Sequence, residues 1–271
     1  TMGKIGQLGT LDEVLALCAV LTVNAVQLQR TSTVTALDVS QGQSIVFSSG
    51  RACAVVDCGG RSTAEDPGDL AARKLLAQGH RSLDLLVLTH PHDDHVNGVL
   101  RLMHWLPVRT LVIPAAADTT QAPLSDILAL AEANHTAVVR VDAERTVTAG
   151  GISVHLYPEP CAGQEDGSMI VLTSIGDYDT LVPGDVDTTA EVKFLSNCTY
   201  PGIELLLVGH HGSKKSTCDA WLDAIAPDAA IISVGDNSYG HPTSETLERL
   251  QAHNIPIYRT DQMGDITVHL S

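Results

Sequence analysis

The side chains best suited to chemistry stand together in Leu86–Gly98, where the sequence reads LVLTHPHDDHVNG. An apolar segment that is typical of a strand leads directly into His90, His92, Asp94 and His95. In an extended loop, residues at this spacing point alternately to one side, so they could converge on a pair of cations. Imidazole and carboxylate ligands suit Zn²⁺ or Mn²⁺ better than thiophilic metals. The alternative is a polar surface loop, but solvation alone does not require three histidines and two aspartates in six residues.

Two later strand ends carry side chains of the same kind. The predicted strand Asp179–Val182 ends in Pro-Gly-Asp185, and the predicted strand Glu204–Val208 is followed by Gly-His210-His211-Gly-Ser. Gly-Asp after a strand is also an ordinary turn or helix cap, so Asp185 alone is a weak signal. The paired histidines are a strong signal. Neighbours on an extended segment face opposite ways, so the sequence does not decide which histidine would bind a metal.

Composition limits the class of protein. The chain has 271 residues, a formal net charge of -16 and 44% hydrophobic residues, which fits one domain with a well-buried core. Only 3% of the residues are aromatic, so we expect a core of Val, Leu, Ile and Ala, as in sheets covered by helices. The acidic charge counts against a polyanionic substrate, although bound divalent cations would supply local positive charge where a phosphate would lie.

The six cysteines are spread widely and form no C-x-x-C pair. This spacing excludes a zinc knuckle and a dense disulfide scaffold. Cys53 and Cys58 lie in or beside a predicted strand, where small buried thiols are common, so we expect unpaired core residues there.

Alternating strands and helices must position these side chains. Period-two hydrophobic alternation from Thr33 predicts a meander of strands, and a strand at Leu83–Leu88 delivers the histidine-rich stretch. Helices are predicted at Asp66–Gln78, Val96–Trp105 and Gln121–Asn134. This order of elements predicts an α/β protein with two sheets and helices outside them.

The first thirty residues are set apart from the rest. An apolar run at residues 11–26 is interrupted by polar side chains and is shorter than the roughly 20 residues that a membrane span needs. Either it is a helix that packs on the domain, or it is the stub of a membrane helix. We therefore divide the chain into a leader, residues 1–30, and one domain, residues 31–271, which carries the candidate ligands.

The pattern His-x-His-x-Asp-His after an apolar strand resembles the signature of the metallo-β-lactamase fold superfamily. That resemblance implies a four-layer αββα fold, hydrolytic activity and usually two metal ions. Further segments resemble one branch, the C-terminal metallo-β-lactamase-like domain of ComEC-type DNA-uptake competence proteins. The resemblance extends from Val34 to Leu270, and the segments that carry it are Leu37–Ser44, Asp57–Gly60, Val234–Pro242 and Tyr258–Gly264.

The resemblance also implies a ligand set. In it, one metal is held by His90 and His92, a second by Asp94, His95 and His211, and Asp185 bridges the two, while His210 is a near neighbour. Two departures from the family pattern stand out. The branch usually shows Asp-Val-Gly-Gln-Gly-Asp where this chain has Ser40 and Gln43. Many superfamily members have another metal-binding histidine before the bridging aspartate, and residues 165–168 contain none.

The implied activity is that of a phosphodiesterase, specifically a DNase on single-stranded DNA. Zinc lowers the pKa of bound water to about 7, so a metal-bound hydroxide would be the nucleophile at neutral pH. Asp94, His210 and His241 are then catalytic candidates. Ser213, Lys214, Lys215 and His241 are the candidates for substrate contact.

The expected surroundings follow from the same resemblance. They are the membrane-channel portion of a longer protein, on the extracytoplasmic face of a membrane, with no nucleotide cofactor. Two other functions remain open. One is a small-molecule metallohydrolase that acts on a choline-phosphate ester, a lactone or a lactam. The other is a degenerate domain that positions DNA without cleaving it.

Overall fold

The structure is a computed structural model, and it describes residues 13–16, 18–19, 31–61, 65–158 and 168–270. The predicted leader and both interpretations of the apolar run at 11–26 therefore lie mostly outside the described residues. Within the described ranges, no helix is both long enough and apolar enough to cross a membrane.

In the described part of the chain, fourteen strands form two seven-stranded sheets. In sheet A the order across the sheet is β14 (Ile266–Leu270), β1 (Ser32–Ala36), β2 (Ile45–Ser49), β3 (Ala52–Val56), β4 (Leu83–Val87), β5 (Val108–Pro114) and β6 (Ala137–Val141). In sheet B it is β13 (Ile257–Arg259), β12 (Ala229–Ile232), β11 (Leu205–Leu207), β10 (Tyr178–Val182), β9 (Met169–Ile175), β8 (Ile152–Pro158) and β7 (Arg145–Ala149).

Both sheets are built in the same way. Each contains an antiparallel meander, β1-β2-β3 in sheet A and β7-β8-β9-β10 in sheet B. Each continues with parallel strands, β4-β5-β6 in sheet A and β11-β12-β13 in sheet B. Parallel strands need crossover connections, which the helices supply, and their carboxyl ends meet at one edge of each sheet. The predicted meander at the start of the chain is confirmed.

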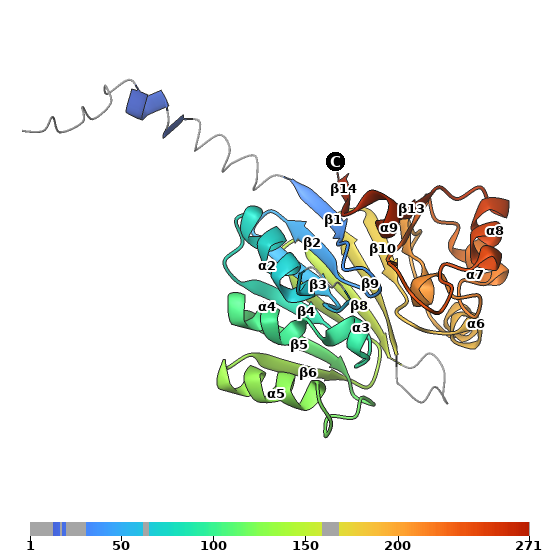
Figure 1. Ribbon diagram of the computed structural model, residues 1–271, viewed down its shortest axis with the longest axis horizontal. Coiled ribbons are helices and arrows are strands. Elements are labelled where there is room, and N and C mark those ends of the chain that lie inside the picture. Colours follow the sequence, from blue (N-terminus) through green and yellow to red (C-terminus); the bar gives the residue numbers. More distant parts are fainter. Residues whose placement is uncertain (1–12, 17, 20–30, 62–64, 159–167, 271) are drawn as a thin grey trace, which may run out of the picture.

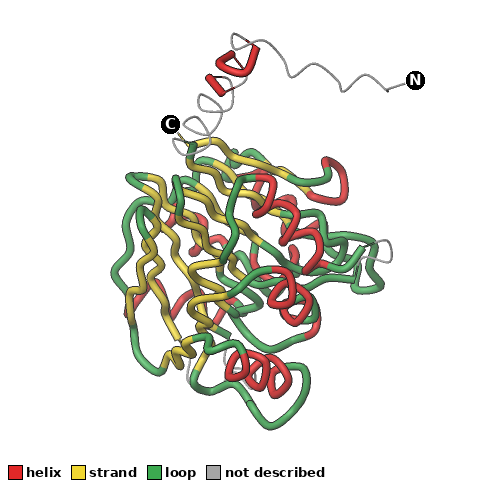
Figure 2. The backbone as a smooth tube through the Cα atoms, turned by 90° about the vertical axis from the view of Figure 1, so that its left-hand side faces the viewer, coloured by secondary structure: helices red, strands yellow, loops and turns green. Residues whose placement is uncertain are grey.

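Helices cover the outer faces of both sheets (Figure 1). On sheet A lie α2 (Pro67–Ala77), α4 (Val99–Trp105) and α5 (Leu124–Ala133), and on sheet B lie α6 (Thr188–Asn197), α7 (Asp219–Ile225) and α8 (Ser244–Ala252). The turned view in Figure 2 shows the strands running side by side, with helices packed along them. The predicted four-layer αββα fold is confirmed.

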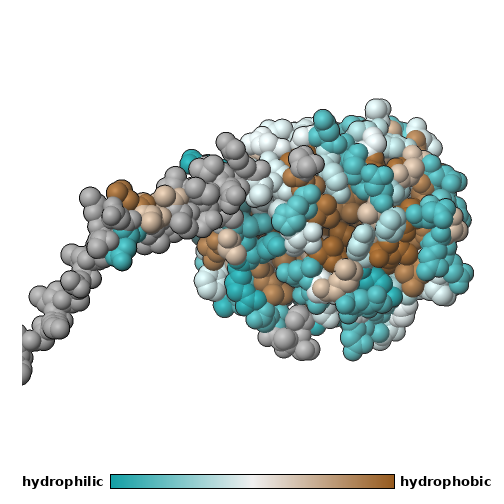
Figure 3. Space-filling model, turned by 90° about the horizontal axis from the view of Figure 1, so that it is seen from above, coloured by the Kyte–Doolittle hydropathy of each residue, from teal (hydrophilic) through white to brown (hydrophobic). Residues whose placement is uncertain are grey.

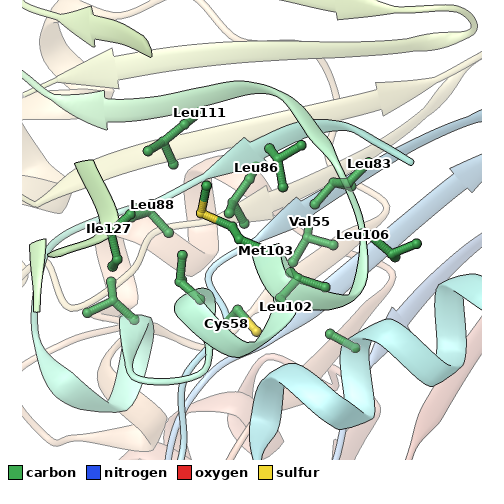
Figure 4. Packing of buried hydrophobic residues seen from close by; sticks show 14 of the residues in the cluster. Val55, Cys58, Leu83, Leu86, Leu88, Leu102, Met103, Leu106, Leu111 and Ile127 are labelled. Carbon is green, nitrogen blue, oxygen red and sulfur yellow. The ribbon is translucent and has the colours of Figure 1, made fainter. Parts of the chain in front are cut away.

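Three apolar clusters hold these layers together. One lies between sheet A and its helices, a second between the two sheets, and a third between sheet B and its helices. Alternation along single strands produces this arrangement: Leu86 faces the helices, whereas Leu85 and Val87 face the other sheet. Figure 4 shows the first cluster, where Leu102 of α4 lies among residues from the strands.

The two cysteines in and beside β3 are buried and unpaired. Cys53 and Cys58 are buried free thiols, as predicted, and both belong to the cluster under the helices of sheet A. Burial raises the pKa of Cys53 to about 12, so this thiol stays protonated and unreactive at neutral pH. Cys161 lies outside the described residues.

Local signals set the helix that precedes β4. Asp66 caps α2 by accepting a hydrogen bond from the backbone N–H of Gly68, and Pro67 occupies the first turn. The prediction of a helix at Asp66–Gln78 is confirmed to within one residue at each end.

The histidine-rich stretch corrects one expectation. We expected an extended loop, but Asp93–Val96 forms a short helix, α3, and α4 begins only at Val99. In the helical turn Asp94 and His95 are consecutive residues on neighbouring faces, while His90 and His92 precede it in extended backbone. The difference arises because the backbone N–H groups of His95 and Val96 bond back to the carbonyl of His92.

Apolar side chains also reach the surface between the edges of the two sheets. A cavity of about 290 Å³ opens there, between β14 and the strands β11 to β13. Its lining includes Tyr178, Tyr258 and Val268. Seen from above, the molecule shows apolar surface grouped between polar side chains (Figure 3).

Candidate metal centre

Six ligand-type side chains converge at the carboxyl ends of β4, β10 and β11. They form two groups of three, and within each group the potential ligand atoms all lie within 4.8 Å of one another. These six residues are the set that the resemblance implies, in the same division. The first group is His90, His92 and Asp185, and the second is Asp94, His95 and His211.

Asp185 lies at the middle of the cluster. Its side chain is only 8% exposed, and four imidazoles surround it. One carboxylate oxygen, Oδ1, lies 3.2 Å from His95 Nε2 and 3.9 Å from His211 Nε2. The other, Oδ2, lies 3.7 Å from His90 Nε2 and 3.5 Å from His210 Nε2. A carboxylate that reaches both groups has the position of a bridging ligand.

Several of these buried atoms have no hydrogen-bond partner. They are the Nε2 atoms of His90, His95 and His211, together with Oδ1 of Asp185. A buried polar atom without a partner costs roughly 1–3 kcal/mol, so four in one place require an explanation. Divalent cations would satisfy them all. The donor set of imidazole nitrogens and carboxylate oxygens fits Zn²⁺ or Mn²⁺.

Asp57 is a positioning residue that the sequence analysis did not single out as part of the site. It follows β3 directly and is fully buried. Its Oδ2 lies 2.8 Å from Nδ1 of His95 and also accepts from the side chains of Gln43 and Thr89, each at 2.7 Å. Because a carboxylate oxygen accepts, His95 donates from Nδ1 to Asp57 and turns Nε2 toward Asp185.

The other two buried imidazoles are oriented in the same sense. Nδ1 of His90 lies 3.0 Å from the hydroxyl of Thr89, and that hydroxyl donates its own proton to Asp57. The hydroxyl therefore accepts from His90. In His211, Nδ1 lies 2.8 Å from the carbonyl oxygen of Ser233, which can only accept. All three rings thus use Nδ1 for hydrogen bonds within the fold and turn Nε2, the atom left to bind a metal, toward the cluster.

The charges in the cluster act on one another strongly. Burial, together with the nearby His95, holds the pKa of His90 well below its ordinary value, so His90 is neutral. Burial disfavours the charged form of His95, yet Asp185 and Asp57 hold its pKa well above the ordinary value. Burial likewise opposes ionisation of Asp185, but the neighbouring His95 keeps its pKa well below the ordinary value. A cation between these groups would replace a proton.

The paired histidines lie in a tight turn instead of an extended segment. His210 and His211 have φ values of 50° and 54° within the short helix η1 (Gly209–Gly212). In this turn the two rings are nearly perpendicular, at 81°. His211 is 3% exposed and belongs to the second group, whereas the His210 side chain is 38% exposed and lies beside Asp185. A side chain at Gly212 would clash with Pro242, so this turn requires glycine.

A second buried carboxylate, Glu191 of α6, supports the same region. It is fully buried and accepts hydrogen bonds from the backbone N–H groups of Thr217 and Cys218. These residues follow η1, so Glu191 anchors the loop that leaves the paired histidines. Burial raises its pKa despite these bonds. The sequence analysis predicted no helix here and did not identify Glu191.

A cavity of about 450 Å³ opens over the two groups. It is lined by five of the residues in or beside the two groups, which are His92, Asp94, Asp185, His210 and His211. Its other lining residues are Gln41, Arg61, Pro91, Asp93, Ala122, Pro123, Tyr239 and His241.

His241 lines this cavity, and its role toward a substrate stays a prediction. Its ring centroid is 5.6 Å from that of His210, and its buried Nδ1 has no hydrogen-bond partner. Burial, with the nearby His210, lowers the pKa of His241. The neutral ring accepts a proton more readily than it gives one.

The other predicted substrate contacts do not line the cavity. Ser213 is buried, and its backbone carbonyl accepts from Thr246. Lys214 and Lys215 are exposed, and their carbonyls are bonded at 3.0 Å by Arg249 and at 2.8 Å by the backbone of Thr188. Their role in substrate binding stays a prediction.

Comparisons with known proteins were made against families, curated proteins and solved structures. A model of the metallo-beta-lactamase superfamily matches residues 37–236. ComE operon protein 3 of Bacillus subtilis is 29% identical over 251 residues, which cover 85% of this chain and 32% of that protein. Competence protein ComA of Neisseria gonorrhoeae is 29% identical over 238 residues, which cover 85% of this chain and 31% of that protein. This chain therefore spans about a third of the length of these relatives.

Solved structures share the fold. The metallo-beta-lactamase fold protein YhfI from Bacillus subtilis superimposes with a TM-score of 0.58 at 13% identity, and the match covers 89% of this chain and 100% of YhfI.

Proposed function

This chain belongs to the metallo-beta-lactamase superfamily, and on that basis we propose that it is a two-metal phosphodiesterase that cleaves single-stranded DNA. One observation carries the proposal. Two groups of three ligand atoms lie beside one open cavity, and four of their buried atoms have no hydrogen-bond partner among the described residues. A catalytic metal site needs such protein ligands together with an open side for substrate.

The proposed ligands are the two groups already described, with Asp185 shared between them. Bound ions would supply Lewis acidity and activate water. The chain's own contribution is orientation. Asp57, Thr89 and Ser233 fix which nitrogen of each buried histidine carries the proton, so no ring has to change its tautomer when substrate arrives. His241, neutral and on the cavity wall, is placed to accept a hydrogen bond or a proton from the substrate.

The choice of DNA rests on the competence proteins among the relatives. The net charge of -16 does not favour a polyanion in general, so binding must depend on contacts at the site itself. By the same analogy, we propose that the domain acts on the extracytoplasmic face of a membrane, beside the channel portion of a longer protein.

The test is hydrolysis by the purified chain with Zn²⁺ or Mn²⁺. Three substrates are compared: single-stranded DNA, bis-p-nitrophenyl phosphate and a β-lactam. We expect cleavage of both phosphodiesters and none of the lactam. His92→Ala should abolish the activity, and His104→Ala, which changes an exposed histidine on α4, is the matched control.

Other outcomes would redirect the proposal. Rapid hydrolysis of the lactam, with no cleavage of phosphodiesters, would identify a small-molecule hydrolase. DNA binding without hydrolysis in either metal would indicate a degenerate domain that only positions DNA.

A further inference from the structure

We propose that Tyr239 and Arg61, with the side-chain amide of Gln41, form a nucleobase-binding subsite at the mouth of the metal cavity. All three residues line that cavity. The inference rests on the proposed phosphodiesterase function and deepens it, because it specifies that the substrate carries a base beside the phosphate that is cleaved.

Tyr239 is an aromatic residue that the fold holds out into solvent. It is 56% exposed, although exposing so large an apolar ring is unfavourable. A single amide, Asn237, organises the loop that carries it. Its Oδ1 accepts from the backbone N–H groups of Tyr239 and His241, each at 3.0 Å, and its Nδ2 donates to the carbonyls of Gly235 and His241, each at 2.8 Å. The ring is therefore presented on an ordered loop, which keeps the entropic cost of binding low.

Two histidine rings lie between the candidate metal ligands and Tyr239. The ring centroids of His210 and His241 are 5.6 Å apart, and those of His241 and Tyr239 are 5.8 Å apart. The planes of Tyr239 and His241 differ by only 30°. A phosphate over Asp185 and a base on Tyr239 would thus lie along one continuous wall of the cavity.

Arg61 completes the outer end of this wall. Its guanidinium carbon lies 5.8 Å from the centroid of the Tyr239 ring, within range of a cation–π contact. Among the described residues that line the cavity, Arg61 is the one arginine or lysine. Asp93 also lines this cavity, and Asp118 lines an adjoining cavity that shares Pro91. The guanidinium beside Tyr239 is therefore the group of this cavity suited to attract a polyanion.

Gln41 distinguishes a base from a second phosphate. Its side chain is only 1% exposed, yet its Oε1 has no hydrogen-bond partner. An amide oxygen accepts hydrogen bonds, as a phosphate oxygen does, so the two repel each other. It suits the N–H groups on the edge of a base, which donate. The backbone N–H of Arg61 donates to the carbonyl of Gln41 at 2.9 Å, which fixes the two residues together.

The test is binding in EDTA, so that cleavage does not interfere. A fluorescent single-stranded oligonucleotide and an abasic strand of the same length are titrated, and anisotropy gives Kd. Tyr239→Ala should weaken binding of the normal strand between about fivefold and a hundredfold, the range for loss of one stacked base, and leave the abasic strand unchanged. Arg61→Ala should weaken both strands, since it removes a charge. Tyr239→Trp should restore the binding.

The controls come from the rest of the chain. Tyr258→Ala changes a partly exposed tyrosine in the cavity between the sheet edges, and Arg109→Ala changes an exposed arginine on β5. Neither should alter Kd. An equal loss on normal and abasic strands with Tyr239→Ala, or no loss on either, would overturn the subsite. Hydrolysis of bis-p-nitrophenyl phosphate by the unchanged chain reports separately on the proposed function, because it does not depend on the strand-binding measurements.

Discussion

The half of the molecule built on sheet A and the half built on sheet B have similar topology, but the corresponding aspartates have different surroundings. In each half an antiparallel meander ends near the candidate ligands, and a buried aspartate follows its last strand: Asp57 after β3 and Asp185 after β10. Asp57 has both oxygens occupied by hydrogen bonds from Gln43, Thr89 and His95. Asp185 has an oxygen without any partner. The aspartate after the meander therefore orients a histidine in one half and is a candidate metal ligand in the other.

This contrast shows that an acidic residue at a strand end is not enough to define a ligand. What decides the role is how many donors the surrounding chain provides. Where neighbours saturate the carboxylate, it positions a histidine. Where the neighbouring residues leave a carboxylate oxygen without a hydrogen bond and place imidazole nitrogens around it, the carboxylate can bind a cation.

The largest effect should come from Asp185→Asn, which removes charge from both groups at once. We expect metal affinity to fall by more than the roughly 10–100-fold that is typical of outer-shell changes, and hydrolysis to fall with it. Elemental analysis after dialysis measures the metal. Asp84→Asn, on β4 but in the cavity at the other end of the strand, is the control and should keep a full complement. Retention of two ions by Asp185→Asn would remove the bridging role.

Asp57→Asn should have a smaller effect of a different kind. An asparagine can still accept from Thr89, but it does not hold the proton of His95 as a carboxylate does. We expect metal affinity about 10–100-fold lower, with two ions still bound at saturating metal. Titration against a chelating dye gives the affinity. If Asp57→Asn and Asp185→Asn lost the same number of ions at saturation, the two halves would not differ as described.

Glu191→Gln tests the support of the second half. The change leaves one of the N–H groups of Thr217 and Cys218 without its carboxylate partner in a buried place. We expect the free energy of unfolding to fall by about 1–3 kcal/mol, with little change in kcat of the folded protein. Urea denaturation measures the loss. Glu132→Gln, an exposed position on α5, should cost almost nothing.

His80 should show the smallest effect, and only at low pH. It is buried beside Ser48, and burial lowers its pKa below the ordinary 6.5. Above pH 6.5 the ring is neutral whether the chain is folded or not. As pH falls below 6.5, the unfolded chain takes up a proton that the folded chain refuses, so stability declines. His80→Gln should therefore flatten the dependence of unfolding free energy on pH as the pH falls below 6.5, relative to the unchanged protein.

The sequence predicted the architecture well, because strand alternation and the cap at Asp66 are local signals. It did not predict α6. That helix mixes Thr, Lys, Ser and Asn, and it is specified by the cap at Asp187 and the burial of Phe194. Nor did the sequence predict the helical turn at Asp93–Val96, which depends on bonds back to His92.

The site was predictable where its residues are close in sequence and less so where they are not. The histidine-rich stretch stood out by spacing alone. The choice between His210 and His211 needed the left-handed turn, which no alternation rule describes. Asp57 lies 38 residues from His95, so only the folded sheet brings it into the site. Its sequence signal was present, an acid at the end of a buried strand, but nothing local connected it to the histidines.

The distribution of the proposed ligands between the two halves also has a mechanical consequence. Each group draws two residues from the turn after β4 in sheet A and one from a strand end of sheet B, Asp185 or His211. A bound ion would therefore cross-link the two sheets, and separating them would require breaking its coordination. At a free metal concentration 1,000 times the dissociation constant, one such ion would add about 4 kcal/mol to the free energy of unfolding. The concentration of free metal would then govern the stability of the folded protein as well as any hydrolysis at the site.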